Sequence, residues 1–269
     1  MHARSALFDL YGDHLEARGG HAPVAALVRL LAPLDIAAPA VRTAVSRMVR
    51  QGWLAPVALR EGPGYLLTAR GRTRVAHAGE RIYRVGLPEW DGTWHLLVVD
   101  GGSARRGRDR VRAGLRFLGY AQLADGTWVA PRASAEAPAL LAAEGVSAAA
   151  FGAHYEGADL AGLVARAWDL DALGASYDRW LQDVGPLVDL VPAGSEDRDD
   201  RTAYAVRSRL VHEWRKFLFT DPGLPAAVLP DRWPGDRAAA FFSAEAERLR
   251  PAADRFVTGC LSVNGLSAR

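Results

Sequence analysis

Five polar side chains recur along one short segment with the spacing that suits contact with nucleic acid. They are Arg42, Thr43, Ser46, Arg47 and Arg50. On a helix over 39–51 they share one side, while the apolar residues of the segment share the other. Guanidinium and hydroxyl groups donate hydrogen bonds to phosphates and to base edges in the DNA major groove. The pattern predicts a recognition helix in which Arg50 meets phosphate and the residues nearer the N-terminus reach bases. An ordinary solvated helix face has the same periodicity and stays open as the alternative.

Another positive side chain, Arg60, stands beside an expected turn. The runs 53–60 and 65–68 are β-prone, and the tetrapeptide Glu61-Gly62-Pro63-Gly64 between them is typical of a turn. A hairpin of this kind beside a recognition helix predicts a wing that contacts the DNA backbone. Glu61 opposes the charge of Arg60. We therefore expect either that the wing adds little affinity or that the phosphate contact comes from Arg70, Arg72 or Arg74 instead.

Three helices and this hairpin must position the basic face. Apolar residues at helical spacing predict helices over 3–18, 23–32 and 39–51, and another helix, 69–83, follows the hairpin. This order is that of a winged helix-turn-helix, which we expect to occupy residues 1–86.

The rest of the chain predicts two further domains. A strand over 94–99, a helix over 104–118, a strand at 128–129, a helix over 135–144 and a strand over 148–155 indicate a ferredoxin-like domain, residues 87–170. Helical patterns over 160–168, 173–190, 202–219 and 237–256 indicate a helical C-terminal domain, residues 171–269. The fold class predicted is therefore α+β.

Charge is distributed unevenly over the 269 residues. The formal net charge is +2, yet residues 1–85 carry 12 arginines against six acidic residues, and the remainder is net acidic. A basic N-terminal segment on an acidic chain is a common layout for a nucleic-acid-binding domain joined to another domain. The densest basic run is Arg105, Arg106, Arg108, Arg110 and Arg112. Such a run reaches DNA or an anionic ligand in some proteins and is more often a solvated helix face.

Composition excludes several classes of protein. No apolar run approaches the roughly 18 residues of a membrane span, so we expect no membrane association and a cytoplasmic location. The single cysteine, Cys260, excludes an internal disulfide and a thiolate zinc cluster, and we expect it to be buried or inert. The histidines show no metal-ligand spacing, so we expect no metal and no cofactor.

Three segments together resemble the PaaX family of bacterial transcriptional regulators. They are Leu10-Tyr11-Gly12-Asp13 with Arg18-Gly19-Gly20, the run from Val41 to Leu54, and Leu210 to Phe217 leading into Asp221-Pro222-Gly223-Leu224-Pro225. The resemblance covers essentially the whole chain, including the middle part that begins at Trp90-Asp91-Gly92. It implies a winged helix, a ferredoxin-like middle and a helical C-terminal domain. It also implies a homodimeric repressor that binds double-stranded operator DNA and is released by an acyl-CoA, with phenylacetyl-CoA as the effector of the founding members.

An acyl-CoA needs cations for its phosphates and an apolar pocket for its acyl group. The segment that offers both contains Arg209, His212, Trp214, Arg215 and Lys216. We therefore predict the effector site there. Aromatic residues at helical spacing more often belong to a core, so a structural role for Trp214 with locally paired charges is the alternative.

Two other functions stay open at this point. Asp100 ends the first strand of the ferredoxin-like domain, where small nucleases of that fold hold a metal ion, which would make the protein a metal-dependent nucleic-acid hydrolase. Because we find no acidic partner for Asp100 and no catalytic motif, we expect that the protein is not an enzyme. An acyl-CoA-binding or scaffold protein that does not use DNA is the other alternative.

Overall fold

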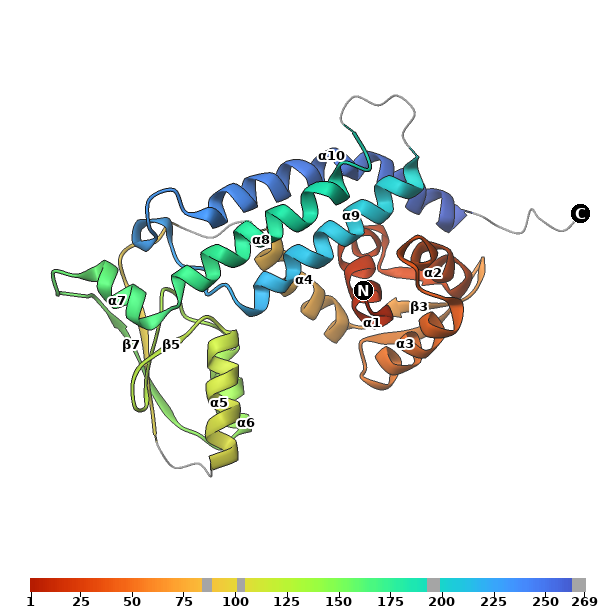
Figure 1. Cartoon of the computed structure of the whole chain (residues 1–269). Helices are drawn as coiled ribbons and strands as arrows, with labels where there is room; N and C mark the ends of the chain where they lie inside the picture. Colours follow the sequence, from red (N-terminus) through yellow and green to blue (C-terminus); the bar gives the residue numbers. More distant parts are fainter. Residues whose placement is uncertain (84–88, 101–104, 193–198, 263–269) are drawn as a thin grey trace, which may run out of the picture. The chain divides into compact units, whose positions relative to one another are not determined.

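The computed structural model describes residues 1–83, 89–100, 105–192 and 199–262 (Figure 1). Contacts divide the chain into two compact units. The first unit contains residues 1–86, 179–215 and 237–269, and the second contains residues 87–178 and 216–236. Each unit thus joins segments distant in sequence. The three domains predicted from the sequence, 1–86, 87–170 and 171–269, are continuous ranges, whereas each of these units combines several segments. The three-domain division stays a prediction.

The first unit begins with three helical segments in place of the single helix expected over 3–18. Helix α1 (Ala3–Leu10) continues into a π-helical turn, η1 (Tyr11–Leu15), and a 3-10 turn, η2 (Glu16–Arg18). Gly19, with φ of +92°, ends the run. Helix α2 (Val24–Leu31), the 3-10 turn η3 (Ala32–Leu34) and helix α3 (Ala38–Arg50) follow, close to their predicted limits.

A chain reversal separates α2 and α3. The helical segments Val24–Leu34 and Ala38–Arg50 are bent by 119° with respect to each other. Asp35 adopts φ of 61°, a left-handed conformation that aspartate tolerates better than most residues. Pro39 stands in the first turn of α3, where the missing N–H costs no hydrogen bond. The three residues 35–37 therefore suffice to redirect the chain.

A three-stranded antiparallel sheet completes the N-terminal segment. Its strands are β1 (His21–Pro23), β2 (Leu54–Leu59) and β3 (Gly62–Leu67), in the order β1-β3-β2. The sequence did not predict β1, and the turn expected over Glu61 to Gly64 is wrong in extent. The turn is Arg60-Glu61, and Gly64 lies inside β3 opposite Pro23 of β1. A Cβ on residue 64 would lie 2.6 Å from the Ala22 carbonyl oxygen. Glycine at this position therefore allows β1 and β3 to approach each other closely.

The core of the first unit combines both ends of the chain. Leu7, Leu27, Leu31 and Val45 are fully or almost fully buried and pack in one cluster with residues of α9 (Asp200–Trp214) and α10 (Pro234–Ser262). The C-terminal members of this cluster are Tyr204, Ala253, Val257 and Cys260. Burial of Cys260 confirms the expectation for that thiol. Helix α4 (Ala69–Tyr83) matches its predicted limits, and Thr68 accepts a hydrogen bond from the N–H of Gly71 at its start.

The second unit contains a four-stranded antiparallel sheet. Its strands are β4 (Trp94–Val99), β5 (Ala121–Ala124), β6 (Thr127–Ala130) and β7 (Ala148–Ala153), in the order β5-β6-β4-β7. With helices α5 (Arg105–Phe117) and α6 (Ala137–Ala143), the element order is β-α-β-β-α-β, the ferredoxin-like order. The sequence missed β5 and therefore predicted one strand too few. The mixture of helices and antiparallel sheets confirms the α+β class.

Helices α5 and α6 cover one face of this sheet. Leu97 and Trp128 of the sheet pack with Val111 and Leu115 of α5 and Leu141 of α6. Helix α7 (Leu160–Ala167) begins at Asp159, whose side chain accepts a hydrogen bond from the N–H of Gly162 at 2.7 Å. Helix α8 (Leu170–Val188) comes next in the chain. After α9 there are two 3-10 turns, η4 (Arg215–Phe219) and η5 (Ala226–Val228).

In the described ranges, no single helix has the length and apolar character needed to cross a membrane. Among those residues, the pair Val24–Leu34 and Ala38–Arg50 together has the length and composition of a span, and it is bent by 119°.

Candidate nucleic-acid interface

Helix α3 separates into an apolar face and a cationic face. Val41, Ala44, Val45 and Met48 are buried and hold the helix against the core of the first unit. The five predicted DNA-binding residues of this helix, Arg42, Thr43, Ser46, Arg47 and Arg50, are all exposed. Helix α1 and strand β2 both contact α3, and these contacts hold the helix that carries the cationic face. All five side chains are therefore accessible, and their contact with DNA stays a prediction.

One of the five side chains is already engaged within its own helix. The Thr43 hydroxyl donates a hydrogen bond of 2.9 Å to the Pro39 carbonyl oxygen, four residues earlier. Threonine commonly makes this bond inside helices. The hydroxyl oxygen can still accept a hydrogen bond. Thr43 is therefore better suited to a hydrogen-bond donor on a DNA base than to a phosphate, which only accepts.

The arginines of this surface have no anionic partner in the described part of the chain. We find no ion pair to Arg42, Arg47 or Arg50, nor to Arg60 at the hairpin turn, within residues 1–83, 89–100, 105–192 and 199–262. Arg60 is exposed next to Glu61, as its place in the turn predicts. Uncompensated guanidinium groups on one helix face attract a polyanion.

The predicted effector residues, in contrast, are paired or buried. Arg209 donates to the Asp35 carboxylate at 2.7 Å. His212 Nδ1 and Arg215 Nε both lie 2.8 Å from the Asp9 carboxylate, and the Arg215 guanidinium also lies over the Phe8 ring at 5.5 Å.

The remaining two members of that set differ from each other. Trp214 is only 4% exposed and packs between Trp180 and Phe242, which agrees with a core role. Lys216 is exposed and belongs to the second unit. A ligand at this site would have to replace the contacts of Arg209, His212 and Arg215. The effector site in this segment stays a prediction.

Sequence reasoning missed a buried ionic cluster that joins η1 to α9 and α10. Arg207 has no exposed surface, forms an ion pair with Asp13, and donates from Nε to the Ala246 carbonyl at 3.0 Å. Burial lowers the pKa of the Arg207 guanidinium to about 10, so it stays charged at neutral pH. The spacing of Asp9 and Asp13 on an otherwise apolar stripe was the available signal, because buried carboxylates require partners.

A histidine completes this cluster. His14 is 2% exposed, and its Nδ1 lies 3.3 Å from the Asp254 carboxylate, to which Arg18 also donates at 2.9 Å. Burial lowers the pKa of His14, because the charged imidazole loses its hydration, and this loss outweighs the opposing effect of the Asp254 carboxylate. The hydrogen bond with His14, helped by Arg18, holds the pKa of Asp254 well below its usual range.

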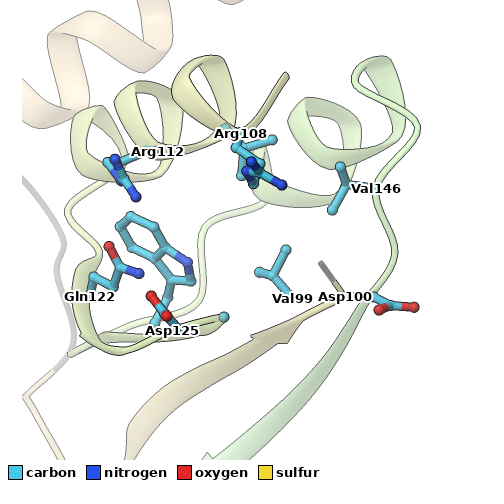
Figure 2. Close-up of a pocket in the computed structure, with 10 residues that line it drawn as sticks. Val99, Asp100, Arg108, Arg112, Gln122, Asp125 and Val146 are labelled. Atoms are coloured by element: carbon cyan, nitrogen blue, oxygen red, sulfur yellow. The ribbon is translucent and has the colours of Figure 1, made fainter. Parts of the chain in front are cut away.

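The second unit contains a pocket of about 430 Å³ beside α5 (Figure 2). Its lining includes Asp100, which the sequence had singled out, and Asp125, which it had not. Asp125 lies in the turn between β5 and β6 and was missed together with β5. Among the described residues no group of three or more His, Cys, Asp or Glu side chains could hold a metal ion.

The basic run on α5 is divided by its partners. Arg110 donates two hydrogen bonds to the Glu144 carboxylate, of 2.7 and 2.5 Å. Arg108 and Arg112 line the pocket. The side chains of Arg105 and Arg106 lie outside the described residues.

Comparisons with known proteins agree with the resemblance seen in the sequence. Family models match in three places: PaaX-like protein over residues 2–71, the PaaX protein central Cas2-like domain over 87–159, and the PaaX-like protein C-terminal domain over 168–259. The transcriptional repressor PaaX of Escherichia coli (strain K12) is 31% identical over 273 residues, which cover 98% of this chain and 86% of that protein.

A solved structure is also similar to this chain over most of the length of both. It is that of an uncharacterised protein from Mycobacterium tuberculosis, with 27% sequence identity and a TM-score of 0.58, covering 93% of this chain and 98% of that chain. The identity to the repressor and the three domain matches lead to one conclusion. The chain belongs to the PaaX family.

Proposed function

We propose that this protein is a transcriptional repressor that binds operator DNA through the exposed face of α3. The observation that carries the proposal is the set of three unpaired, exposed arginines on that helix, Arg42, Arg47 and Arg50. Membership of the PaaX family and the 31% identity to a named repressor support it. Localisation in the cytoplasm is part of the same proposal.

The helix-turn-helix assignment is supported by geometry. Two helices at about 90–120°, joined by three or four residues, are the usual form of the motif. The 119° bend between Val24–Leu34 and Ala38–Arg50 and the three-residue connection agree with it. In this arrangement α3 is the recognition helix and the β2-β3 hairpin, with Arg60 at its turn, is the wing.

The polarity of α3 suggests how it would lie in the groove. Residues near the N-terminus of a recognition helix usually read base edges. Arg42, Thr43, Ser46 and Arg47 are therefore assigned to bases or to nearby phosphates, and Arg50, in the last turn, to phosphate. The Thr43 hydroxyl bonded to Pro39 would accept a hydrogen bond from a base amino group.

Dimerisation and release by an effector complete the proposal. A homodimer would place two α3 helices in successive major grooves, roughly 34–36 Å apart, on a pseudo-palindromic operator. An acyl-CoA such as phenylacetyl-CoA would release DNA if it binds more tightly to the conformation that does not fit this spacing. The three-domain division at 1–86, 87–170 and 171–269 assigns DNA binding to the first range and regulation to the others.

A titration of labelled DNA followed by fluorescence anisotropy tests this function. The DNA is the segment upstream of the protein's own gene, with a scrambled duplex of equal length as the control. We expect specific binding whose affinity falls as salt rises, because cations on α3 displace counterions from phosphates. Binding that is equal for both duplexes would contradict operator recognition, and no binding to either duplex would favour the scaffold alternative.

The effector is tested in the same titration. We expect phenylacetyl-CoA, added to the preformed complex, to lower the anisotropy to that of free DNA. Specific binding that ignores this compound would retain the repressor and reject this particular effector. The metal-dependent hydrolase is not favoured by the comparisons, and it is not proposed.

A further inference from the structure

Strand β7 forms an edge of the sheet in the second unit, and its outer side is open. It is the last strand in the order β5-β6-β4-β7 and pairs with β4 from Ala148 opposite Val99 to Ala153 opposite Trp94. All its residues except the last are exposed. An edge strand of this kind presents a row of unpaired N–H and C=O groups, to which another strand can bind.

The other three edges of the two described sheets are protected, whereas β7 is not. Pro23 in β1 and Pro56 in β2 each lack a backbone N–H. Strand β5 has a register shift between Gln122 and Ala124 and contacts helix α7. Prolines, bulges and covering helices are the usual features that prevent pairing at an edge. Strand β7 contains no proline and keeps a continuous register with β4, so its edge is suited to pairing.

The hydrogen bonds to β4 determine which backbone groups of β7 point outward. The N–H of Asp100 donates to the Ser147 carbonyl oxygen at 2.9 Å, and this pair continues the register of the two strands. Opposite residues in an antiparallel ladder alternate between hydrogen-bonded and non-hydrogen-bonded pairs. The odd-numbered residues of β7 therefore bond to β4. The N–H and C=O groups that point away belong to Ala148, Ala150 and Gly152, and no hydrogen bond to them is found within the described residues.

The side chain of Phe151 adds an apolar surface to this edge. Ala150 lies opposite Leu97, which packs beneath α5 and α6, so its neighbours in β7 face the other side of the sheet. Phe151 is on that uncovered side and is 53% exposed. Val98, 45% exposed, lies there opposite the small Ala149. An exposed phenyl ring and an exposed valine thus accompany the unpaired backbone groups.

A second copy of the same strand supplies the groups that this edge lacks. In an antiparallel pair with Ala150 on the two-fold axis, Ala148 of each copy bonds to Gly152 of the other, and all the outward groups are used. Phe151 of each copy then lies opposite Ala149 of the other. A large side chain meets a small one on the same face, which is a favourable arrangement for packing across strands.

We infer that β7 is the dimerisation edge of this protein and that two copies pair antiparallel through Ala148–Ala153, joining two four-stranded sheets into one of eight strands. Residues 145–155 contain no Asp, Glu, Lys or Arg, so two copies meet without repulsion between like charges. The contact is the same on both sides and closes at two copies. The role of this dimer in holding two α3 helices on an operator rests on the proposed function.

Sedimentation velocity of the full chain, without DNA and over a series of concentrations, tests the assembly. We expect an equilibrium between monomer and dimer, with no larger species, because pairing uses the one open edge of each sheet. A monomer at every concentration would overturn the inference and leave the edge to a strand of another protein. Assemblies that grow beyond the dimer would contradict a closed two-fold contact.

The variant Ala150→Pro removes an outward N–H from each copy. No hydrogen bond to β4 is lost, because the N–H of residue 150 points away from that strand, and proline is tolerated at such a position of an edge strand. Two hydrogen bonds across the axis disappear, so we expect the dissociation constant of the dimer to rise about ten- to a hundredfold. An unchanged dissociation constant would overturn the inference.

Charged variants at the axis test the pairing without proline. Ala150→Lys and Ala150→Glu each place two like charges opposite each other, and each should weaken its own dimer. A mixture of the two should dimerise again, since opposite charges then face each other. A mixture that stays monomeric would contradict this pairing. Leu123→Lys, at an exposed apolar residue of the other edge strand, is the matched control and should dimerise normally; an equal loss there would move the interface to β5.

A DNA titration separates this inference from the proposed function. If the unaltered protein dimerises through β7 and binds no specific DNA, the repressor proposal fails and the interface stands. If it binds its operator specifically as a dimer that all three variants at Ala150 leave intact, the repressor proposal stands and the interface is wrong. Where both hold, Ala150→Pro should bind a single half-site like the unaltered protein and lose its tighter binding to the full operator.

Discussion

Two helices of the first unit each carry arginines, and the two sets meet opposite environments. On α3, Arg42, Arg47 and Arg50 are exposed, and no ion pair to them is found among the described residues. On α9, Arg207 is buried against Asp13, and Arg209 binds Asp35. The same side chain is therefore left exposed on one helix and serves the fold on the other.

The difference lies in the carboxylates that each helix meets. Asp9 and Asp13 stand on the N-terminal helical segments against which α9 packs, so its cations are neutralised from within. Helix α3 packs in the same core as α1 and α2 through apolar residues such as Val41 and Val45. Charge pairing thus separates a structural basic helix from one that remains available to a polyanion.

The largest effect expected from this comparison is on stability. Arg207→Met leaves the Asp13 carboxylate buried without its cation, which should cost about 3–5 kcal/mol of unfolding free energy. Urea denaturation measures the loss. Arg42→Met, on the exposed face, should change stability by no more than about 0.5 kcal/mol.

A double variant checks the cause of that loss. Arg207→Met together with Asp13→Leu removes both charges, and we expect it to recover most of the stability, because a buried pair can often be replaced by apolar residues. If the double variant is as unstable as Arg207→Met alone, the loss comes from the packing of the Arg207 side chain and not from the unpaired charge.

The exposed face of α3 could be predicted from the sequence, whereas the ion pairs of α9 could not. An amphipathic pattern within 13 residues of α3 is local, so the limits predicted, 39–51, differ from Ala38–Arg50 by one residue at each end. The partners of α9 are distant in sequence: Asp9 and His212 are joined only by the tertiary fold. For the same reason β1 and β5, of three and four residues, were missed, since their pairing with β3 and β6 defines them.

The second effect is on DNA affinity. Arg47→Ala should weaken operator binding by about 1–3 kcal/mol if this guanidinium contacts a base, with stability unchanged because the side chain is exposed. Anisotropy titrations on operator and scrambled DNA measure it. Arg50→Ala is the matched comparison, and we expect it to weaken both complexes alike and to reduce the salt slope by about one. Equal affinity of Arg47→Ala and the unaltered protein would argue against α3 as the recognition helix.

The third effect is a dependence of stability on pH, which arises from the buried ionic cluster that contains His14 and Asp254. Because the pKa of His14 is lowered in the folded protein, the unfolded chain binds a proton more readily below about pH 6.5. Stability should therefore fall as pH decreases through that region, by at most about 1.4 kcal/mol per pH unit for one group. The pKa of Asp254 is also lowered, so a further loss should begin near the ordinary carboxylate pKa of about 4.

Urea denaturation at pH 7.5, 6 and 5, three values chosen to span the ordinary histidine pKa of about 6.5, measures this slope. His14→Gln removes the titrating group, and we expect a smaller slope between the first two values in that variant. An identical slope in both proteins would assign the effect to other groups. The His14→Gln substitution should not alter the stability difference between the unaltered protein and Arg47→Ala, since Arg47 lies on the exposed face.

The smallest effect concerns Arg209, which links the two sides of the comparison. Its partner Asp35 lies in the connection between α2 and α3, and the pair is exposed, so Arg209→Ala should cost only about 0.2–1 kcal/mol of stability. Asp35→Asn is the companion variant, because asparagine tolerates the left-handed conformation at that position. A double-mutant cycle at low and high salt measures the coupling, which should weaken as salt increases. A coupling that exceeds about 1 kcal/mol, or a loss of operator affinity in Arg209→Ala, would mean that this ion pair helps to orient α3, and α9 would then be part of the DNA-binding apparatus.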